Sequence, residues 1–165
     1  MQGIQKITPC LWFDRQAEEA ARFYTAIFRN SKILNISYYG EAGQDIHGQA
    51  PGTVMTVSFE LEGHAFTALN GGPIFKFNEA VSFMVNCTDQ AELDFYWDKL
   101  SAVPEAEQCG WIKDRYGLSW QITSAEIDEM LYKGTQEQAD RVTKAFMPMK
   151  KLNLRKIKEA YEGVS

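Results

Sequence analysis

The residues of this chain best suited to chemistry are neutral hydrogen-bonding and aromatic side chains at alternating positions of short apolar segments. Side chains at every second position of a strand share one face. By this alternation we expect nine residues to line a pocket: Thr8, Cys10, Trp12, Phe66, Asn70, Ser82, Met84, Ser119 and Gln121. Hydroxyls, amides and rings hold a small, partly apolar ligand without covalent chemistry. The alternative is that these side chains only fill space and satisfy one another.

Nucleophiles and bases are few and lie far apart in the sequence. Cys10, Cys87 and Cys109 form no C-x-x-C motif, which is typical of reduced packing thiols and not of a disulfide framework or a zinc site. His47 lies in the loop at 40–52 and His64 in a turn, so we expect both to be exposed. A nucleophile pair of Cys10 and His47 stays open, because such groups meet only in space.

Two similar segments position these residues. Residues 4–28 alternate as a strand and then show apolar positions at steps of three and four, which predicts a helix capped by Asp14. Residues 80–100 repeat the plan with Asp89 as the cap, and the tripeptide Gln-Ala-Glu at 16–18 recurs at 90–92. We therefore expect two related halves.

Further strands complete each half. In the first half we predict strands at 32–39, 53–61 and 65–70, the last two joined as a hairpin. In the second half strands are predicted at 107–113 and 117–123, and a further strand within 102–108 stays an alternative. From residue 124 the pattern becomes helical: residues 123–126 and 135–138 both fit a capping box, Gly134 marks a break, and Asn153 caps a third helix.

These elements predict an α+β fold of paired βαβββ modules. We assign residues 1–72 to the first module, 73–124 to a second, shorter module and 125–165 to a helical C-terminal extension. Neither half can bury its sheet alone, so the inner faces are expected to line a cleft. The large aromatics Phe75 and Trp111 fit a core, a dimer contact or a rim that stacks a planar ligand.

Composition excludes several classes of partner. The chain has 165 residues, 45% of them hydrophobic, and a formal charge of −5. Nucleic-acid binding needs clustered Lys and Arg, so neither nucleic acid nor an anionic membrane is an expected partner. The sequence shows no apolar run of about 18 residues and no signal-peptide pattern at its N-terminus. We expect a cytoplasmic protein.

Four segments resemble the PhnB-like branch of the glyoxalase, or vicinal oxygen chelate, superfamily, which includes bleomycin-resistance and dihydroxybiphenyl dioxygenase proteins. They are ITPCLWFDRQAEEAARFY, TALNGGPIFKFNEAVSFMVNC, CGWIKDRYGLSWQI and AFMPMKKLNLRKIKEAYE. The resemblance covers nearly the whole chain and implies the paired βαβββ fold and a homodimer. Domains of this branch are often labelled 3-demethylubiquinone-9 3-methyltransferase, but no Gly-rich strand-to-helix turn of the kind a nucleotide-type cofactor requires is present.

The resemblance also bears on metal binding. Superfamily members that use a divalent metal take His and Glu ligands from the first and last strands of each module. Those positions correspond here to Thr8, Asn70, Ser82 and Gln121, which are weak neutral ligands. We therefore expect no tightly bound metal and no other cofactor, with a weakly bound divalent metal as the alternative.

Three functions follow from this sequence. The first is a protein that binds a small molecule in the cleft between the two modules without a tightly bound metal. The second is a metal-dependent lyase, isomerase or dioxygenase that recruits a loosely held ion through Gln121, Asn70 and a loop residue such as His47. The third is a regulatory or interaction module with a vestigial cleft.

Overall fold

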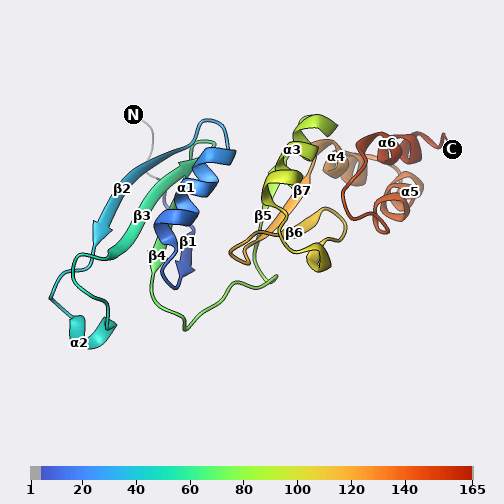
Figure 1. Ribbon diagram of the computed structural model, residues 1–165. Helices are drawn as coiled ribbons and strands as arrows, with labels where there is room; N and C mark the ends of the chain where they lie inside the picture. Colours follow the sequence, from blue (N-terminus) through green and yellow to red (C-terminus); the bar gives the residue numbers. More distant parts are fainter. Residues whose placement is uncertain (1–4, 165) are drawn as a thin grey trace. The chain divides into compact units, whose positions relative to one another are not determined.

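A computed structural model describes residues 5–164 of the chain (Figure 1). The predicted α+β class is confirmed, because helices and two small sheets share the chain. The chain divides into two compact units, Met1–Lys76 and Phe77–Ser165. The helical extension therefore belongs to the same compact unit as the second sheet.

The first unit contains one four-stranded sheet. In chain order its elements are β1 (Cys10–Phe13), α1 (Ala17–Ile27), β2 (Lys32–Tyr38), α2 (Gln44–His47), β3 (Val54–Leu61) and β4 (His64–Asn70). The strand order is β1-β4-β3-β2, with β1 parallel to β4 and the other neighbours antiparallel. The predicted hairpin is confirmed as β3 and β4.

One face of this sheet packs against α1, and that side forms the core of the unit. Leu11 and Phe13 point to this side, and Tyr24 of α1 stacks on Phe59 of β3 with ring centroids 6.4 Å apart. All four side chains are buried, as the apolar stripe of the helix predicted. The opposite face of the sheet is left without a helix of the first unit, as Figure 1 shows.

The start of α1 corrects a prediction. Asp14 lies outside the helix, whose N-cap position is Gln16 without a side-chain cap. The first helical amide is instead satisfied from the sheet, because Asn70 Oδ1 accepts a hydrogen bond from Ala17 N at 2.8 Å. Asp14 fits the local sequence pattern of a helix cap. The acceptor is instead Asn70, a strand residue 53 positions from Ala17.

The second unit contains a three-stranded sheet and most of the helices. Its elements are β5 (Ser82–Asn86), α3 (Gln90–Leu100), the 3₁₀ turn η1 (Pro104–Ala106), β6 (Trp111–Lys113), β7 (Ser119–Thr123), α4 (Ala125–Lys133), α5 (Gln136–Phe146) and α6 (Leu154–Glu162). The strand order is β5-β7-β6. The alternative of a strand within 102–108 is wrong, because Pro104 begins a 3₁₀ turn there.

Most predicted helix caps in the second unit are confirmed. Asp89 accepts from Glu92 N and Asn153 accepts from Lys156 N. Thr135 forms a complete capping box with Gln138. The capping box predicted at 123–126 is wrong: the N-cap of α4 is Ser124 instead of Thr123, and its side chain accepts from Glu126 N at 3.3 Å without a reciprocal bond.

The helical extension is tied to the turn before β6. Cys109 N donates to Met149 O at 2.8 Å and Gly110 N donates to Lys150 O at 2.9 Å. Gly110 has a φ of +82°, and a Cβ there would lie 2.9 Å from Ile122 O, so this position requires glycine. Two backbone hydrogen bonds therefore fix residues 149 and 150 against the sheet.

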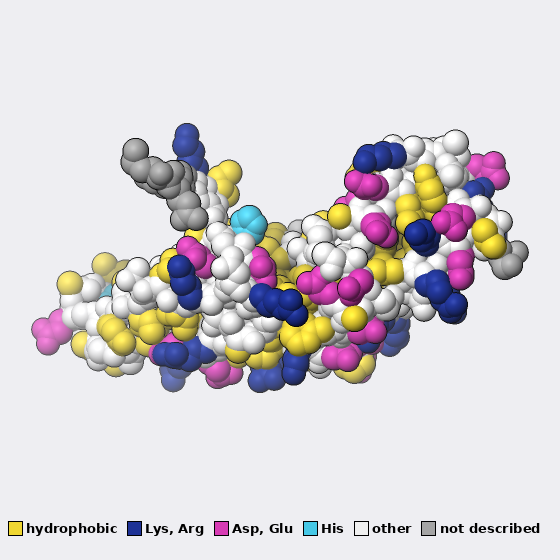
Figure 2. All heavy atoms as spheres, turned by 90° about the horizontal axis from the view of Figure 1, so that it is seen from above, with side chains coloured by type: hydrophobic (Ala, Val, Ile, Leu, Met, Phe, Trp, Pro, Cys, Tyr) yellow, Lys and Arg dark blue, Asp and Glu magenta, His cyan; other side chains and the backbone are white. Residues whose placement is uncertain are grey.

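Within residues 5–164, no helix combines the length and apolarity that crossing a membrane requires. On the face seen in Figure 2, Lys and Arg side chains are interspersed with Asp and Glu.

Candidate functional site

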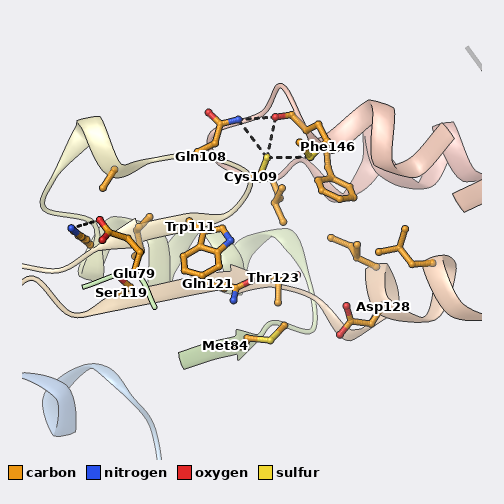
Figure 3. A pocket seen from close by; sticks show the side chains of 17 residues that line it. Glu79, Met84, Gln108, Cys109, Trp111, Ser119, Gln121, Thr123, Asp128 and Phe146 are labelled. Carbon is orange, nitrogen blue, oxygen red and sulfur yellow. Dashed lines mark hydrogen bonds and ion pairs between the residues drawn. The ribbon is translucent and has the colours of Figure 1, made fainter. Parts of the chain in front are cut away.

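A pocket of about 630 Å³ lies in the second unit, between the open face of its sheet and the helical extension (Figure 3). Its walls come from the sheet, from the turn before β6, and from α4 and α5. The residues that line it are Glu79, Met84, Ala106, Gln108, Cys109, Trp111, Ile112, Lys113, Ser119, Gln121, Thr123, Ile127, Asp128, Leu131, Phe146, Met147 and Leu152. A volume of this size suits a small organic molecule.

The strand register brings the predicted residues of this half together. Met84 and Trp111 both lie opposite Gln121, which gives one row across the sheet. Ser82 and Lys113 both lie opposite Ser119, which gives the adjacent row. Cross-strand partners share a face, so Ser82, Met84, Ser119 and Gln121 lie on one side of the sheet. Ser82 lies at the edge of the pocket and does not line it.

The polar groups of the pocket are incompletely satisfied. Gln121 Nε2 donates to Ser82 Oγ at 2.9 Å, which leaves Gln121 Oε1 without a partner among the described residues. Ser119 is fully buried, and its Oγ has no hydrogen-bond partner in the described part of the chain. A buried hydroxyl without a partner costs free energy unless another molecule satisfies it.

Cys109 forms part of the rim beside the extension. Its thiol donates to Met147 O at 3.0 Å and contacts Met147 Sδ at 3.9 Å, as the dashed lines of Figure 3 show. Sequence reasoning missed this residue as a site candidate. The sequence predicts a strand at 107–113, but β6 begins only at Trp111, and the turn before it directs Cys109 to the pocket.

The charged pair at the mouth of the pocket consists of Lys113 on β6 and Glu79 on the segment before β5, which form an ion pair. The hydrogen bond from Lys113 holds the pKa of Glu79 below its usual value. Because Glu79 is exposed, this pair contributes little to stability. It does neutralise the lysine that faces the pocket.

In the first unit, the prediction that Phe66 and Asn70 of β4 share a sheet face with Cys10 and Trp12 is wrong. Cys10 lies opposite Thr67 and Trp12 opposite Leu69, so these four side chains share the open face. Phe66 and Asn70 point to the α1 side instead. Phe66 is buried against Phe59, with ring centroids 5.4 Å apart. Thr8 precedes β1 and is exposed, because the strand begins at Cys10.

Asn70 has a structural role on the α1 side. Besides accepting from Ala17 N, its Nδ2 donates to Val54 O at 3.0 Å, and its backbone carbonyl accepts from Tyr39 Oη at 2.6 Å. It also borders a second hollow of about 580 Å³, most of whose wall comes from the loop at 48–54. The amide that sequence reasoning assigned to a ligand is thus engaged in holding α1 and the loop against β4.

Trp12 remains accessible on the open face of the first sheet. Its indole Nε1 donates to Gly72 O at 2.8 Å, and Phe75 packs edge-on against the ring with centroids 4.9 Å apart. Trp12 is therefore held in one orientation by the segment that follows β4. Phe75, a possible core or rim residue, packs on Trp12 and is otherwise exposed.

The nucleophile candidates show no activated geometry. His47 Nδ1 accepts from Gln49 N at 3.0 Å and its ring packs on Tyr39, so the imidazole is engaged within its own loop. Burial raises the pKa of Cys10, and burial together with Glu92 and Asp89 raises the pKa of Cys87 to about 12. A raised pKa keeps a thiol protonated and unreactive at neutral pH. No hydrogen bond joins Cys10 to His47 among the described residues.

The positions that correspond to the superfamily metal ligands do not fit a divalent ion. Asn70 lies on the α1 side of its sheet with both side-chain polar atoms bonded, and the Gln121 amide is bonded to the Ser82 hydroxyl. Within residues 5–164, no group of three or more His, Cys, Asp or Glu side chains is arranged to hold a metal. Hydroxyls and amides alone bind divalent ions weakly.

Comparison with known proteins identifies the family. Residues 5–123 match the 3-demethylubiquinone-9 3-methyltransferase family. A PhnB protein of Bacillus cereus, described as a 3-demethylubiquinone-9 3-methyltransferase, is 36% identical, with a TM-score of 0.58 over 71% of this chain and 97% of the other. Protein PA1353 of Pseudomonas aeruginosa shares the fold at 19% identity, with a TM-score of 0.53 over 72% of this chain and 95% of the other. No curated protein matches the chain. The chain belongs to the PhnB-like 3-demethylubiquinone-9 3-methyltransferase family.

Proposed function

We propose that this protein binds a small, partly apolar molecule in the pocket of its second unit, and that it does so without a tightly bound metal. The observation that carries this proposal is the buried Ser119 hydroxyl, which lacks a partner within the described chain beside a pocket of about 630 Å³. A ligand with a hydrogen-bonding group would bond the free Gln121 Oε1 and, once the side chains that cover Ser119 shift, its hydroxyl, while Trp111 and Met84 contact the apolar part of the ligand.

The methyltransferase name of the family is not part of this proposal. A nucleotide-type cofactor is usually bound where a Gly-rich turn leads from a strand into a helix. In this chain the Gly71-Gly72 pair follows β4 and leads into the irregular segment 71–81, with no helix after it. The features of the pocket support the binding of a small molecule. They give no support for the transfer of a methyl group.

The test is ligand-induced stabilisation of the wild-type protein and a Ser119→Ala variant. A panel of small aromatic and aliphatic compounds is screened by thermal shift, where a ligand at a hundredfold its Kd stabilises by about 2.7 kcal/mol. We expect Ser119→Ala to leave the unliganded protein as stable as wild type or more stable, because it removes an unsatisfied buried group. The same variant should lose most of the stabilisation by any compound that binds.

The matched control is Ser58→Ala, which removes a half-buried hydroxyl from the first unit. It should leave the ligand-induced shift unchanged. A panel in which no compound stabilises the protein would contradict the proposal and favour an interaction module with a vestigial cleft. A shift that appears only with added divalent ions and disappears in Gln121→Ala would instead favour the metal-dependent enzyme.

We also propose that the protein is a homodimer. The open face of the first sheet supports this, because Cys10 is exposed and Trp12, Thr67 and Leu69 are only half-buried there. Such a face of mixed apolar and polar side chains is suited to contact with a second copy. Size-exclusion chromatography with light scattering should give twice the chain mass of 18.8 kDa. A mass equal to one chain at micromolar concentration would refute the dimer.

A further inference from the structure

The pocket of the second unit is lined by one carboxylate that has no ion-pair partner among the described residues. Three side chains with a formal charge line it: Glu79, Lys113 and Asp128. Glu79 and Lys113 neutralise each other as an ion pair. Asp128 has no ion pair or hydrogen bond to any of residues 5–164. A ligand entering the pocket therefore meets a single unpaired carboxylate.

The fold directs this carboxylate toward the pocket. Ile127, Asp128 and Leu131 of α4 all line the pocket. Leu131 is four positions from Ile127 and three from Asp128, so it is a surface neighbour of both on the helix. The neighbouring Glu126 is exposed, and Glu129 pairs with Lys133 at 3.0 Å on the solvent side. Asp128 is thus the acidic residue of α4 that faces the pocket rather than solvent.

The other lining residues of this pocket suit a positive charge and do not suit a negative one. Trp111 and Phe146 supply aromatic faces, which attract a cation through their negative π surfaces. Gln121 Oε1 is a free acceptor on the sheet wall of the pocket. No arginine lines the pocket, and its single lysine is already paired. An anionic group would find no unpaired positive charge among the described lining residues.

We infer that this pocket takes an organic cation, a small molecule in which a protonated or quaternary amine adjoins an apolar or aromatic body. The inference deepens the proposed function and depends on it. The amine lies toward Asp128 and the aromatic faces, while the body contacts Met84, Met147 and Leu152. Ser119 and Gln121 then select ligands with an additional hydrogen-bonding group. Figure 3 shows Asp128 and Trp111 extending from separate elements toward the same hollow.

The test compares three probes of similar size and different charge. Benzyltrimethylammonium, benzyl alcohol and benzoate are titrated at pH 7.5 into the full-length protein, and binding is followed by isothermal titration calorimetry. We expect the cation to bind about tenfold tighter than benzoate, as for one favourable charge contact in a partly open pocket. The advantage should shrink as salt rises, because screening weakens it.

Variants separate the charge from other effects. Asp128→Asn keeps the size of the side chain and should bring the affinity for the cation close to that for benzyl alcohol. Glu126→Gln removes a charge from the same helix on its exposed side and should leave the order of affinities unchanged. Both variants lie at positions that tolerate an amide, so folding can be verified by circular dichroism before titration.

The outcomes distinguish this inference from the proposed function. Equal affinity for all three probes, or a preference for the cation that survives in Asp128→Asn, would overturn the cation inference alone. The inference also fails by itself if none of the three probes binds while other compounds give a shift that depends on Ser119. If no compound of any charge binds, the proposed function and this inference fail together.

Discussion

Replacing Asp114 by alanine is expected to lower the free energy of unfolding of the second unit by about 3 kcal/mol or more. Asp114 is fully buried in the turn between β6 and β7. Its Oδ1 accepts from Tyr116 N at 2.8 Å and Leu118 N at 3.1 Å, and its Oδ2 accepts from Trp120 Nε1 at 2.8 Å. Removing the carboxylate leaves these three donors without their acceptor in the interior.

Urea denaturation followed by tryptophan fluorescence measures this loss, because Trp120 loses its partner in the same event. The matched control is Asp140→Ala on the exposed side of α5, where the carboxylate accepts one hydrogen bond from Gln136. That control should change the free energy by less than about 0.5 kcal/mol. Equal effects of the two substitutions would mean that Asp114 does not hold the turn.

Asp114→Ala is also expected to disturb the pocket, because the pairing of β6 with β7 positions several of its lining residues. The β6–β7 hairpin carries Trp111, Ser119 and Gln121, and Asp114 closes the turn between them. Loosening this turn would let the two strands shift against each other. Ligand binding and stability should therefore fall together in Asp114→Ala, whereas Ser119→Ala should affect binding without lowering stability.

The half of the site on the second sheet could be predicted because its strands alternate clearly. On β5 and β7 the apolar residues Phe83, Trp120 and Ile122 occupy one set of positions, so Ser119 and Gln121 had to share the other face. Period-two patterning of this kind determines which side chains lie together without any knowledge of the partner strand. The register then only decides which residues become neighbours.

The same reasoning failed on β4, because both of its faces contain apolar residues. One face of β4 carries Ala65, Thr67 and Leu69, and the other carries Phe66, Ala68 and Asn70. The polar side chain of Asn70 suggested a ligand contact. The structure assigns that amide to the first turn of α1, where it replaces the missing local cap. A cap from a distant strand depends on tertiary packing, so no local pattern could indicate it.

The remaining wall of the pocket was beyond prediction for a similar reason. Ile127 and Leu131 reach the pocket from α4, which begins directly after β7, and Phe146 reaches it where the chain at 149–150 pairs with the turn at 109–110. Helix patterning showed that the extension has apolar faces but not what each face covers. Asp114 was likewise visible only as a turn residue, since its burial depends on the packing of Trp120.

Replacing Gly71 by alanine should destabilise the first unit by about 2 kcal/mol, because the new methyl group has no space. A Cβ at this position would overlap the six-membered ring of Trp12, at Cζ2, Cε2 and Cη2. The backbone of Gly71 has no positive φ, so alanine itself is conformationally acceptable there. The penalty must therefore come from the contact with Trp12, whose ring cannot move easily while Phe75 packs against it and Gly72 O binds its indole nitrogen.

A double-mutant cycle isolates that contact. In a Trp12→Ala background, Gly71→Ala should cost less than about 0.5 kcal/mol, which gives a coupling energy of about 1.5 kcal/mol or more. Gly72→Ala is the matched control: its φ is +92° and its Cβ would meet only Gln49 Nε2 at 3.7 Å, so its cost of about 1 kcal/mol reflects backbone strain. That cost should be the same with or without the indole. If Gly71→Ala were equally costly in both backgrounds, the penalty would not come from the contact with Trp12, and the close approach of this ring would not be the reason for glycine at position 71.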